Sequence, residues 1–181
     1  MKKTCVFIIG TNGVGKTSLA KRLINGFGGI SDYHEKITYC KDVRACFVGK
    51  YEGVKFGGVD GLDNVTHLAE RVNDGLKKCD FVFCEGKYIK NFSMNVLNAM
   101  FQAERQIVVF LYAPVAVLDE RLRKRGGRGI TQYVWRDQKA IARNAKRWQE
   151  IGATLLQYDT SEFSLEFMES DIRRKLSGLC G

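Results

Sequence analysis

The sequence predicts an α/β fold in which helices cover a mostly parallel β-sheet. Strand-like and helix-like stretches alternate along the chain, and the strand-like stretches are mostly continuous apolar runs, which is typical of strands buried on both faces. A glycine-rich loop separates the first strand-like stretch from the first helix-like stretch. The 181 residues, of which 45% are apolar and only one is proline, have the length and composition of one domain over residues 1–181.

The first half of the chain predicts three strands and two helices. Thr4–Ile9 is an apolar run and predicts a buried strand. Gly15–Asn25 predicts a helix because its leucines recur on one face. Lys36–Cys40 predicts a short second strand. Leu62–Cys79 predicts a helix from apolar residues at helical spacing, and Asp80–Cys84 predicts the third strand.

The second half predicts two more strands and three helices. Gln106–Tyr112 is almost wholly apolar and predicts a central strand. Pro114 opens the next helix, because proline is favoured in a first helical turn. Thr131–Glu150 predicts a helix, Thr154–Tyr158 the fifth strand, and Ser161–Lys175 a closing helix. The ligand site of such a sheet is expected at the carboxyl ends of its strands.

The loop after the first strand carries the pattern Gly10-x-x-x-x-Gly15-Lys16-Thr17. Its glycines let several backbone N–H groups face one anion, and the helix N-terminus adds partial positive charge. In this pattern the lysine reaches the β- and γ-phosphates and the hydroxyl ligates magnesium. The loop therefore predicts binding of ATP and Mg²⁺, with nucleotide contacts from Asn12, Gly13, Val14, Gly15, Lys16, Thr17 and Ser18.

Other motifs distinguish between the classes of protein that carry such a phosphate loop. The guanine-reading motif Asn-Lys-x-Asp and the switch motif Asp-x-x-Gly of GTPases are absent from the sequence. The helix that starts at Pro114 ends in Arg121-Leu122-Arg123-Lys124-Arg125-Gly126-Gly127-Arg128. This run resembles the lid of the nucleotide-kinase-like P-loop kinases, whose arginines close over the transferring phosphoryl group. Planar guanidinium donors suit the charge that spreads over that group.

The resemblance to these kinases covers essentially the whole chain in element order. It implies a P-loop NTPase fold, a three-layer α/β/α sandwich whose five-stranded parallel sheet has the order 2-3-1-4-5, with an arginine-rich lid at about residues 121–130. It also implies nucleotide contacts from Arg121 and Arg128 and a catalytic role for Arg125. The stretch Tyr158–Ser161 matches the position where such kinases wrap the adenine.

Three carboxylates are candidates to hold the magnesium ion, or to orient or deprotonate the hydroxyl group that accepts the phosphate. Glu85 ends an apolar strand, so it is a candidate to hold magnesium or to orient the acceptor hydroxyl. Asp42 follows the predicted second strand, where related kinases place a carboxylate that accepts the acceptor's proton, and Arg44 is a candidate clamp for the acceptor or a phosphate. Asp60 is a second candidate base. The sequence leaves open which of the three is the base.

Residues 42–61 form the predicted acceptor-binding loop, which interleaves aromatic, lysine and glycine residues. Its run Tyr51-x-Gly53-x-Lys55-Phe56-Gly57-Gly58-x-Asp60 resembles that of the phage 5-hydroxymethyluracil DNA kinases. The resemblance implies transfer of phosphate to the 5-hydroxymethyl group of a base in phage DNA, which must leave the duplex stack. Predicted substrate-binding residues are Arg44, Phe47, Tyr51, Lys55, Phe56 and Asp60.

The charge favours a polyanionic partner. The chain has 29 basic and 20 acidic residues, and residues 105–147 alone hold eleven basic and three acidic ones. In the predicted helix Thr131–Glu150, four cations form one stripe, at Arg136, Lys139, Arg143 and Arg147. DNA is therefore the predicted partner. The alternatives are a kinase of a free nucleotide or small metabolite, and a nucleic-acid-binding module with a regulatory nucleotide.

Cysteine usage and the N-terminus predict a cytoplasmic protein, in the host cytoplasm if a phage encodes it. The six cysteines show no metal-ligand spacing and several lie in apolar runs, so reduced core thiols are expected. The apolar run before Gly10 is too short for a signal peptide or a membrane span, so no membrane partner is expected. The sequence leaves a monomer and a homodimer equally open.

Overall fold

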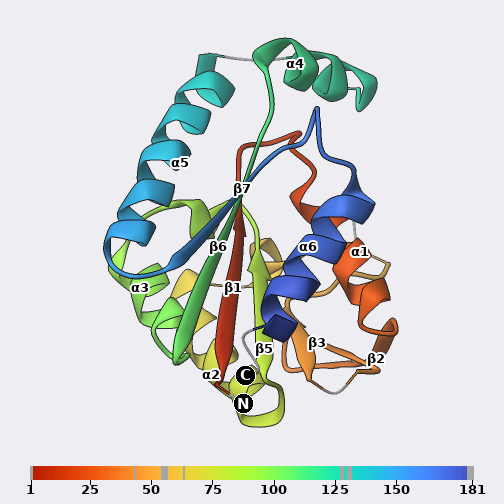
Figure 1. Cartoon of the computed structure of the whole chain (residues 1–181), viewed down its shortest axis with the longest axis vertical. Coiled ribbons are helices and arrows are strands. Elements are labelled where there is room, and N and C mark those ends of the chain that lie inside the picture. The colour runs from red at the N-terminus through yellow and green to blue at the C-terminus, as the bar shows by residue number, and fades with distance from the viewer. Residues whose placement is uncertain are drawn as a thin grey trace.

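The centre of the molecule is a seven-stranded sheet with the strand order β2-β3-β4-β5-β1-β6-β7 (Figure 1). The computed structural model describes residues 2–42, 44–53, 57–62, 64–126, 129 and 132–178. The strands are β1 (Thr4–Ile9), β2 (Ile30–His34), β3 (Ile37–Cys40), β4 (Ala45–Val48), β5 (Phe81–Glu85), β6 (Arg105–Tyr112) and β7 (Thr154–Asp159).

The expected five-stranded parallel sheet of order 2-3-1-4-5 is wrong. β4, β5, β1, β6 and β7 pair in parallel, but the predicted second strand, β3, runs antiparallel to both of its neighbours. The sequence does not predict β2, because this edge strand has no apolar run and its residues are largely exposed. The four residues of β4 are all buried, but they stand at the start of the glycine-rich stretch that was assigned to a loop.

Helices lie on both faces of the sheet, as expected. They are α1 (Lys16–Gly26), α2 (Leu68–Lys78), α3 (Met94–Met100), α4 (Val115–Lys124), α5 (Gln132–Glu150) and α6 (Leu165–Gly178), with short 3₁₀ turns η1 (Val59–Gly61), η2 (Val65–His67) and η3 (Tyr88–Lys90). α1 and α6 cover one face, and α2, α3 and α5 cover the other (Figure 1). α3 was not predicted. None of the described helices has both the length and the apolar character that crossing a membrane requires.

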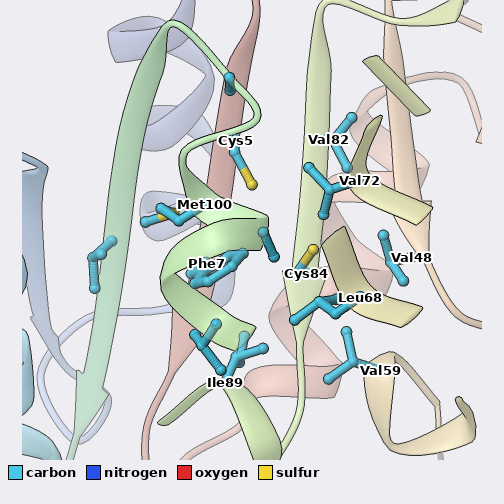
Figure 2. Close-up of a cluster of buried hydrophobic side chains, with 14 of the residues drawn as sticks. Cys5, Phe7, Val48, Val59, Leu68, Val72, Val82, Cys84, Ile89 and Met100 are labelled. Carbon is cyan, nitrogen blue, oxygen red and sulfur yellow. The ribbon is translucent and has the colours of Figure 1, made fainter. Parts of the chain in front are cut away.

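The two faces of the sheet carry separate apolar layers. Along β1 the side chains alternate, so that Phe7 faces α2, α3 and α5 while Val6 and Ile8 face α1 and α6. Figure 2 shows part of the first layer, including Phe7, Leu68 and Val72. Five of the six cysteines lie in these layers as free, buried thiols, which confirms that expectation for Cys5, Cys40, Cys46, Cys79 and Cys84. Cys180 lies outside the described residues.

One aromatic stack anchors the second layer beneath the predicted acceptor loop. The ring of Phe47 in β4 is fully buried and stacks on Phe83 of β5 with a centroid distance of 4.4 Å. Tyr51 meets Phe47 edge-on at 5.7 Å, and only 2% of Tyr51 is exposed. These rings fill the core, where aromatic pairs add stability beyond the apolar area that they bury.

Replacing Phe47 with leucine should therefore lower the free energy of unfolding by about 1–3 kcal/mol, because the smaller side chain loses the stack and leaves a gap. Urea unfolding followed by circular dichroism measures this quantity. Phe101→Leu is the matched control, because about half of Phe101 is exposed, and it should change the free energy by less than about 0.5 kcal/mol. Equal, small effects of the two substitutions would show that Phe47 does not anchor the core.

Candidate functional site

The glycine-rich loop between β1 and α1 has the backbone shape of an anion-binding nest. Gly13 and Gly15 have φ angles of +87° and +94°, in the left-handed region that side chains disfavour. Left-handed residues in this position turn successive N–H groups toward one point, and α1 begins there at Lys16. The Lys16 Nζ atom donates hydrogen bonds to the carbonyls of Gly10 and Thr11, at 3.0 Å each. Its ammonium is thus held at the edge of the nest.

The end of β5 meets the start of α1. β5 pairs in parallel with β1, with Glu85 opposite Ile8, so the Glu85 carboxylate emerges beside the phosphate loop. The Thr17 hydroxyl donates to Glu85 Oε1 at 3.1 Å. A hydroxyl and a carboxylate are the hard oxygen donors that Mg²⁺ prefers, and Mg²⁺ in nucleotide sites takes only a few protein ligands. The residues present therefore fit the magnesium ion that the sequence predicts.

Burial dominates the electrostatics of Lys16 and Glu85. Desolvation lowers the pKa of the Lys16 ammonium, and the nearby charges of Glu85 and Asp60 oppose that shift. Desolvation also raises the pKa of Glu85 to about 7, against the opposing effects of Lys16 and of the Thr17 hydrogen bond. Each group is therefore closer to neutrality than it would be in water. Perturbed pairs of this kind in a cavity are typical of functional sites.

A cavity of about 560 Å³ opens beside these groups. It brings together nine residues that the sequence singled out, namely Asn12, Gly13, Gly15, Lys16, Thr17, Ser18, Asp60, Glu85 and Arg125. It is also lined by Gly57 of the predicted acceptor-binding loop, by Leu122 of the predicted lid, and by Lys87, which sequence reasoning did not assign to the site. The available signal for Lys87 was its position two residues after Glu85, at the carboxyl end of a parallel strand.

Asp60 reaches this cavity because its loop folds onto the end of β5. Gly58 has a φ angle of +71°, and a Cβ atom there would lie 2.7 Å from Glu85 Oε1, so only glycine fits. Gly58 also forms an isolated antiparallel bridge with Lys50, which closes the base of the loop. Asp60 Oδ1 accepts a hydrogen bond from the Lys87 backbone N–H at 2.8 Å. These contacts place the Asp60 carboxylate beside Glu85 at the cavity wall.

A second cavity, of about 440 Å³, also borders the phosphate loop, at Gly13, Val14 and Gly15. Its lining includes the predicted nucleotide contacts Val14 and Arg121, together with Thr160 and Phe163 after β7. Arg121 donates to the Thr160 hydroxyl at 2.7 Å and to the Thr160 carbonyl at 2.6 Å, which ties α4 to this segment. Arg125 lines both cavities. Thr160 of the predicted adenine segment therefore lines a cavity that borders the phosphate loop.

The structure separates Asp42 and Arg44 from this site, which corrects their assignment as base and clamp. They follow β3, which runs antiparallel to β4, so they lie at the edge where the parallel strands begin rather than where they end. The Arg44 carbonyl accepts hydrogen bonds from the N–H groups of Asp80 and Phe81 at the start of β5. Asp42 and Arg44 form an ion pair of 2.8 Å, and the Arg44 guanidinium lowers the pKa of Asp42.

Two predicted substrate-binding residues, Phe47 and Tyr51, lie away from the cavity as well. Phe47 and Tyr51 are packed in the apolar core, so their ring faces are not turned to the cavity in this structure. Burial raises the pKa of Tyr51 well above its ordinary value, consistent with a core position. The predicted contacts at Lys55, Phe56 and Arg128 lie outside the described residues.

Comparisons with known proteins show the fold. No protein-family model matches the chain, and a search of curated protein sequences found no match. Among solved structures, the Bacillus subtilis YorR protein in complex with phosphorylated GDP matches with a TM-score of 0.54 and 15% identity, over 96% of this chain and 95% of that one. Deoxyadenosine kinase from M. mycoides with bound dCTP matches with a TM-score of 0.53 and 14% identity, over 96% and 99% of the two chains.

A sugar kinase from Janibacter sp. HTCC2649 matches with a TM-score of 0.51 and 15% identity, over 99% of this chain and 95% of that one. These matches span nearly the full length of each chain. The protein therefore has the α/β fold of nucleoside and sugar kinases.

The raised pKa of Glu85 predicts how stability depends on pH. The unfolded chain ionises this carboxyl near its ordinary pKa of 4.5, whereas the folded protein ionises it near 7. The free energy of unfolding of the parent should therefore fall as pH rises across this interval. Glu85→Gln lacks this titration, so its stability relative to the parent should rise by about 2–3 kcal/mol between pH 4.5 and 7.5.

Urea unfolding of the ligand-free protein, without added metal, at several pH values measures this difference. The control is Gln149→Ala, at an exposed residue that does not ionise and lines neither cavity, and its stability relative to the parent should stay constant across the same range. A constant difference for Glu85→Gln as well would show that Glu85 is not held in a desolvated position.

Proposed function

We propose that this protein is an ATP- and magnesium-dependent kinase that transfers the γ-phosphoryl group of ATP to a hydroxyl acceptor. The observation that carries the proposal is the convergence of the Lys16 ammonium, the Thr17–Glu85 contact and the Asp60 carboxylate on one cavity beside a nest of backbone N–H groups. The fold shared with nucleoside and sugar kinases supports it.

The donor ATP would place its phosphates in the nest and its nucleoside in the cavity lined by Arg121, Thr160 and Phe163. Lys16 and Arg125 offset the negative charge that develops on the transferring group. Thr17 and Glu85 would hold the magnesium ion, which neutralises phosphate oxygens when it is bound. Residues 121–130 act as a lid that excludes water and so suppresses hydrolysis of ATP.

The acceptor hydroxyl would enter from the side of Asp60 and Lys87. Its oxygen forms a bond to the γ-phosphorus while the bond from that phosphorus to the β–γ bridging oxygen breaks and ADP leaves. The hydroxyl proton passes to a carboxylate. We assign that base to Asp60 rather than Asp42, because Asp60 lines the cavity and, among the described contacts, only one of its two carboxylate oxygens is engaged.

Two classes of acceptor have support. The 5-hydroxymethyl group of 5-hydroxymethyluracil in DNA is favoured by the Tyr51–Asp60 loop pattern and by the basic surface of α5. A free (deoxy)nucleotide or another small metabolite is favoured by the ligands of the structural neighbours, which include phosphorylated GDP and dCTP. The cavity volume of about 560 Å³ suits one nucleotide-sized group in either case.

An acceptor assay separates these candidates. Transfer of labelled γ-phosphate is followed with oligonucleotides that contain 5-hydroxymethyluracil, with the same sequences containing thymine, and with free nucleotides. We expect label only in the modified oligonucleotide, and Lys16→Ala should lower transfer at least about a hundredfold. Label in free nucleotides alone would establish the small-molecule acceptor. Parental transfer by Lys16→Ala would overturn the kinase proposal as a whole.

The assignment of the base predicts opposite outcomes for two conservative substitutions. Asp60→Asn should lower kcat about 10²- to 10⁴-fold, because the amide cannot accept the acceptor's proton. Asp42→Asn is the matched control at the far edge of the sheet and should leave kcat within about threefold of the parent. Steady-state kinetics with saturating ATP measure both values. The reverse pattern would return the role of base to Asp42.

A further inference from the structure

A row of cations runs along the exposed face of α5. Arg136, Lys139, Arg143 and Arg147 are all exposed and follow one another at steps of three, four and four residues, which keeps them on one stripe. At a rise of about 1.5 Å per residue, the stripe is about 16 Å long. Its length matches several successive phosphates of a nucleic-acid strand rather than a single small anion.

None of the described ion pairs involves a cation of this stripe. The acidic residues of α5 are Asp137 and Glu150, and Asp137 is engaged by Lys90 of η3. Among the described residues, neither Arg136 nor Arg143 forms an ion pair. Like charges one helical turn apart repel each other and destabilise a helix slightly. An external polyanion would remove that cost.

Two exposed aromatic rings precede the cations at the start of the helix. Tyr133 is 76% exposed and Trp135 is 44% exposed, although large aromatic side chains usually lie in the core. The Lys139 Nζ atom lies 3.8 Å from the centroid of the Trp135 ring. Lys139 covers one face of Trp135, and exposed rings of this kind stack on bases beside cations that meet phosphates.

The same end of α5 adjoins the candidate site. The Thr11 hydroxyl of the phosphate loop donates to the Val134 carbonyl in the first turn of α5, at 3.5 Å. The Lys90–Asp137 ion pair and a hydrogen bond of 2.9 Å from Asn144 to the Lys90 carbonyl hold η3 against α5. Lys87, which directly precedes η3, lines the cavity. The exposed aromatic end of α5 is thus joined to the acceptor side of the site.

We propose that the exposed face of α5 binds single-stranded nucleic acid and directs it toward the cavity. This proposal rests on the proposed function with a nucleic-acid acceptor. The cations of the stripe contact successive phosphates, while Tyr133 and Trp135 stack on unpaired bases. A single strand fits better than a duplex because paired bases bury their faces against one another and leave none for the two rings.

The test is binding of a short, fluorescein-labelled oligothymidylate, measured by fluorescence anisotropy at increasing salt and without ATP. The parent should bind with a steep salt dependence. The double variant Arg136→Gln/Arg143→Gln should bind at least about tenfold more weakly, and the slope of log affinity against log salt should fall by about 1.4, or about 0.7 per lost contact. Trp135→Ala should weaken binding about tenfold with an unchanged slope.

The matched control is Arg173→Gln/Arg174→Gln, which removes the same charge from α6 on the opposite face of the sheet and should bind like the parent. Parental affinity of the α5 double variant, equal losses in both double variants, or a preference for anionic lipid vesicles over the oligonucleotide would each overturn the proposal. Parental affinity of Trp135→Ala would overturn the stacking role. None of these results bears on the kinase proposal, which the Lys16-dependent transfer assay decides separately.

Discussion

The candidate site depends on the parallel pairing of β1 with β5, because this pairing fixes Glu85 beside the first turn of α1. The register places Glu85 level with Ile8, two residues before the phosphate loop begins. Gly58 can press against Glu85 only because it lacks a side chain, and this close approach carries Asp60 into the cavity wall.

The charges around the cavity form a partly compensated set. Lys16, Lys87 and Arg125 face Asp60 and Glu85 across its lining. Because burial pushes both Lys16 and Glu85 toward their neutral forms, the ligand-free protein holds this set at an energetic cost. A phosphorylated ligand would bring negative charge to Lys16, and an accompanying divalent cation would bring positive charge to Glu85, so that the proposed ligands would lower this cost.

The sequence predicts the parts of the site that depend on local chemistry. The phosphate loop requires only a strand, glycines and a helix start, so Lys16 and Thr17 could be assigned from spacing alone. The position of Asp42 could not be assigned in that way, because it depends on the direction in which β3 pairs. β2 and β4 are short, and β2 is largely exposed, so no hydrophobic pattern predicts these two strands. The sequence therefore does not predict that β3 runs antiparallel to both of them. The prediction that Phe47 and Tyr51 bind substrate fails because β4 was not predicted. Phe47 lies in this buried strand, and Tyr51 packs on Phe47 in the core.

The bridge between Lys50 and Gly58 has an evolutionary consequence. It ties Gly58 to the chain just after β4, so a substitution at an exposed position such as Glu52 need not disturb Asp60 or Glu85, whereas the buried Tyr51 is held by the core. Loops closed in this way tolerate variation at little thermodynamic cost. Sequence changes at such exposed positions can therefore accumulate in the descendants of one ancestral chain while Asp60 and Glu85 keep their places at the cavity.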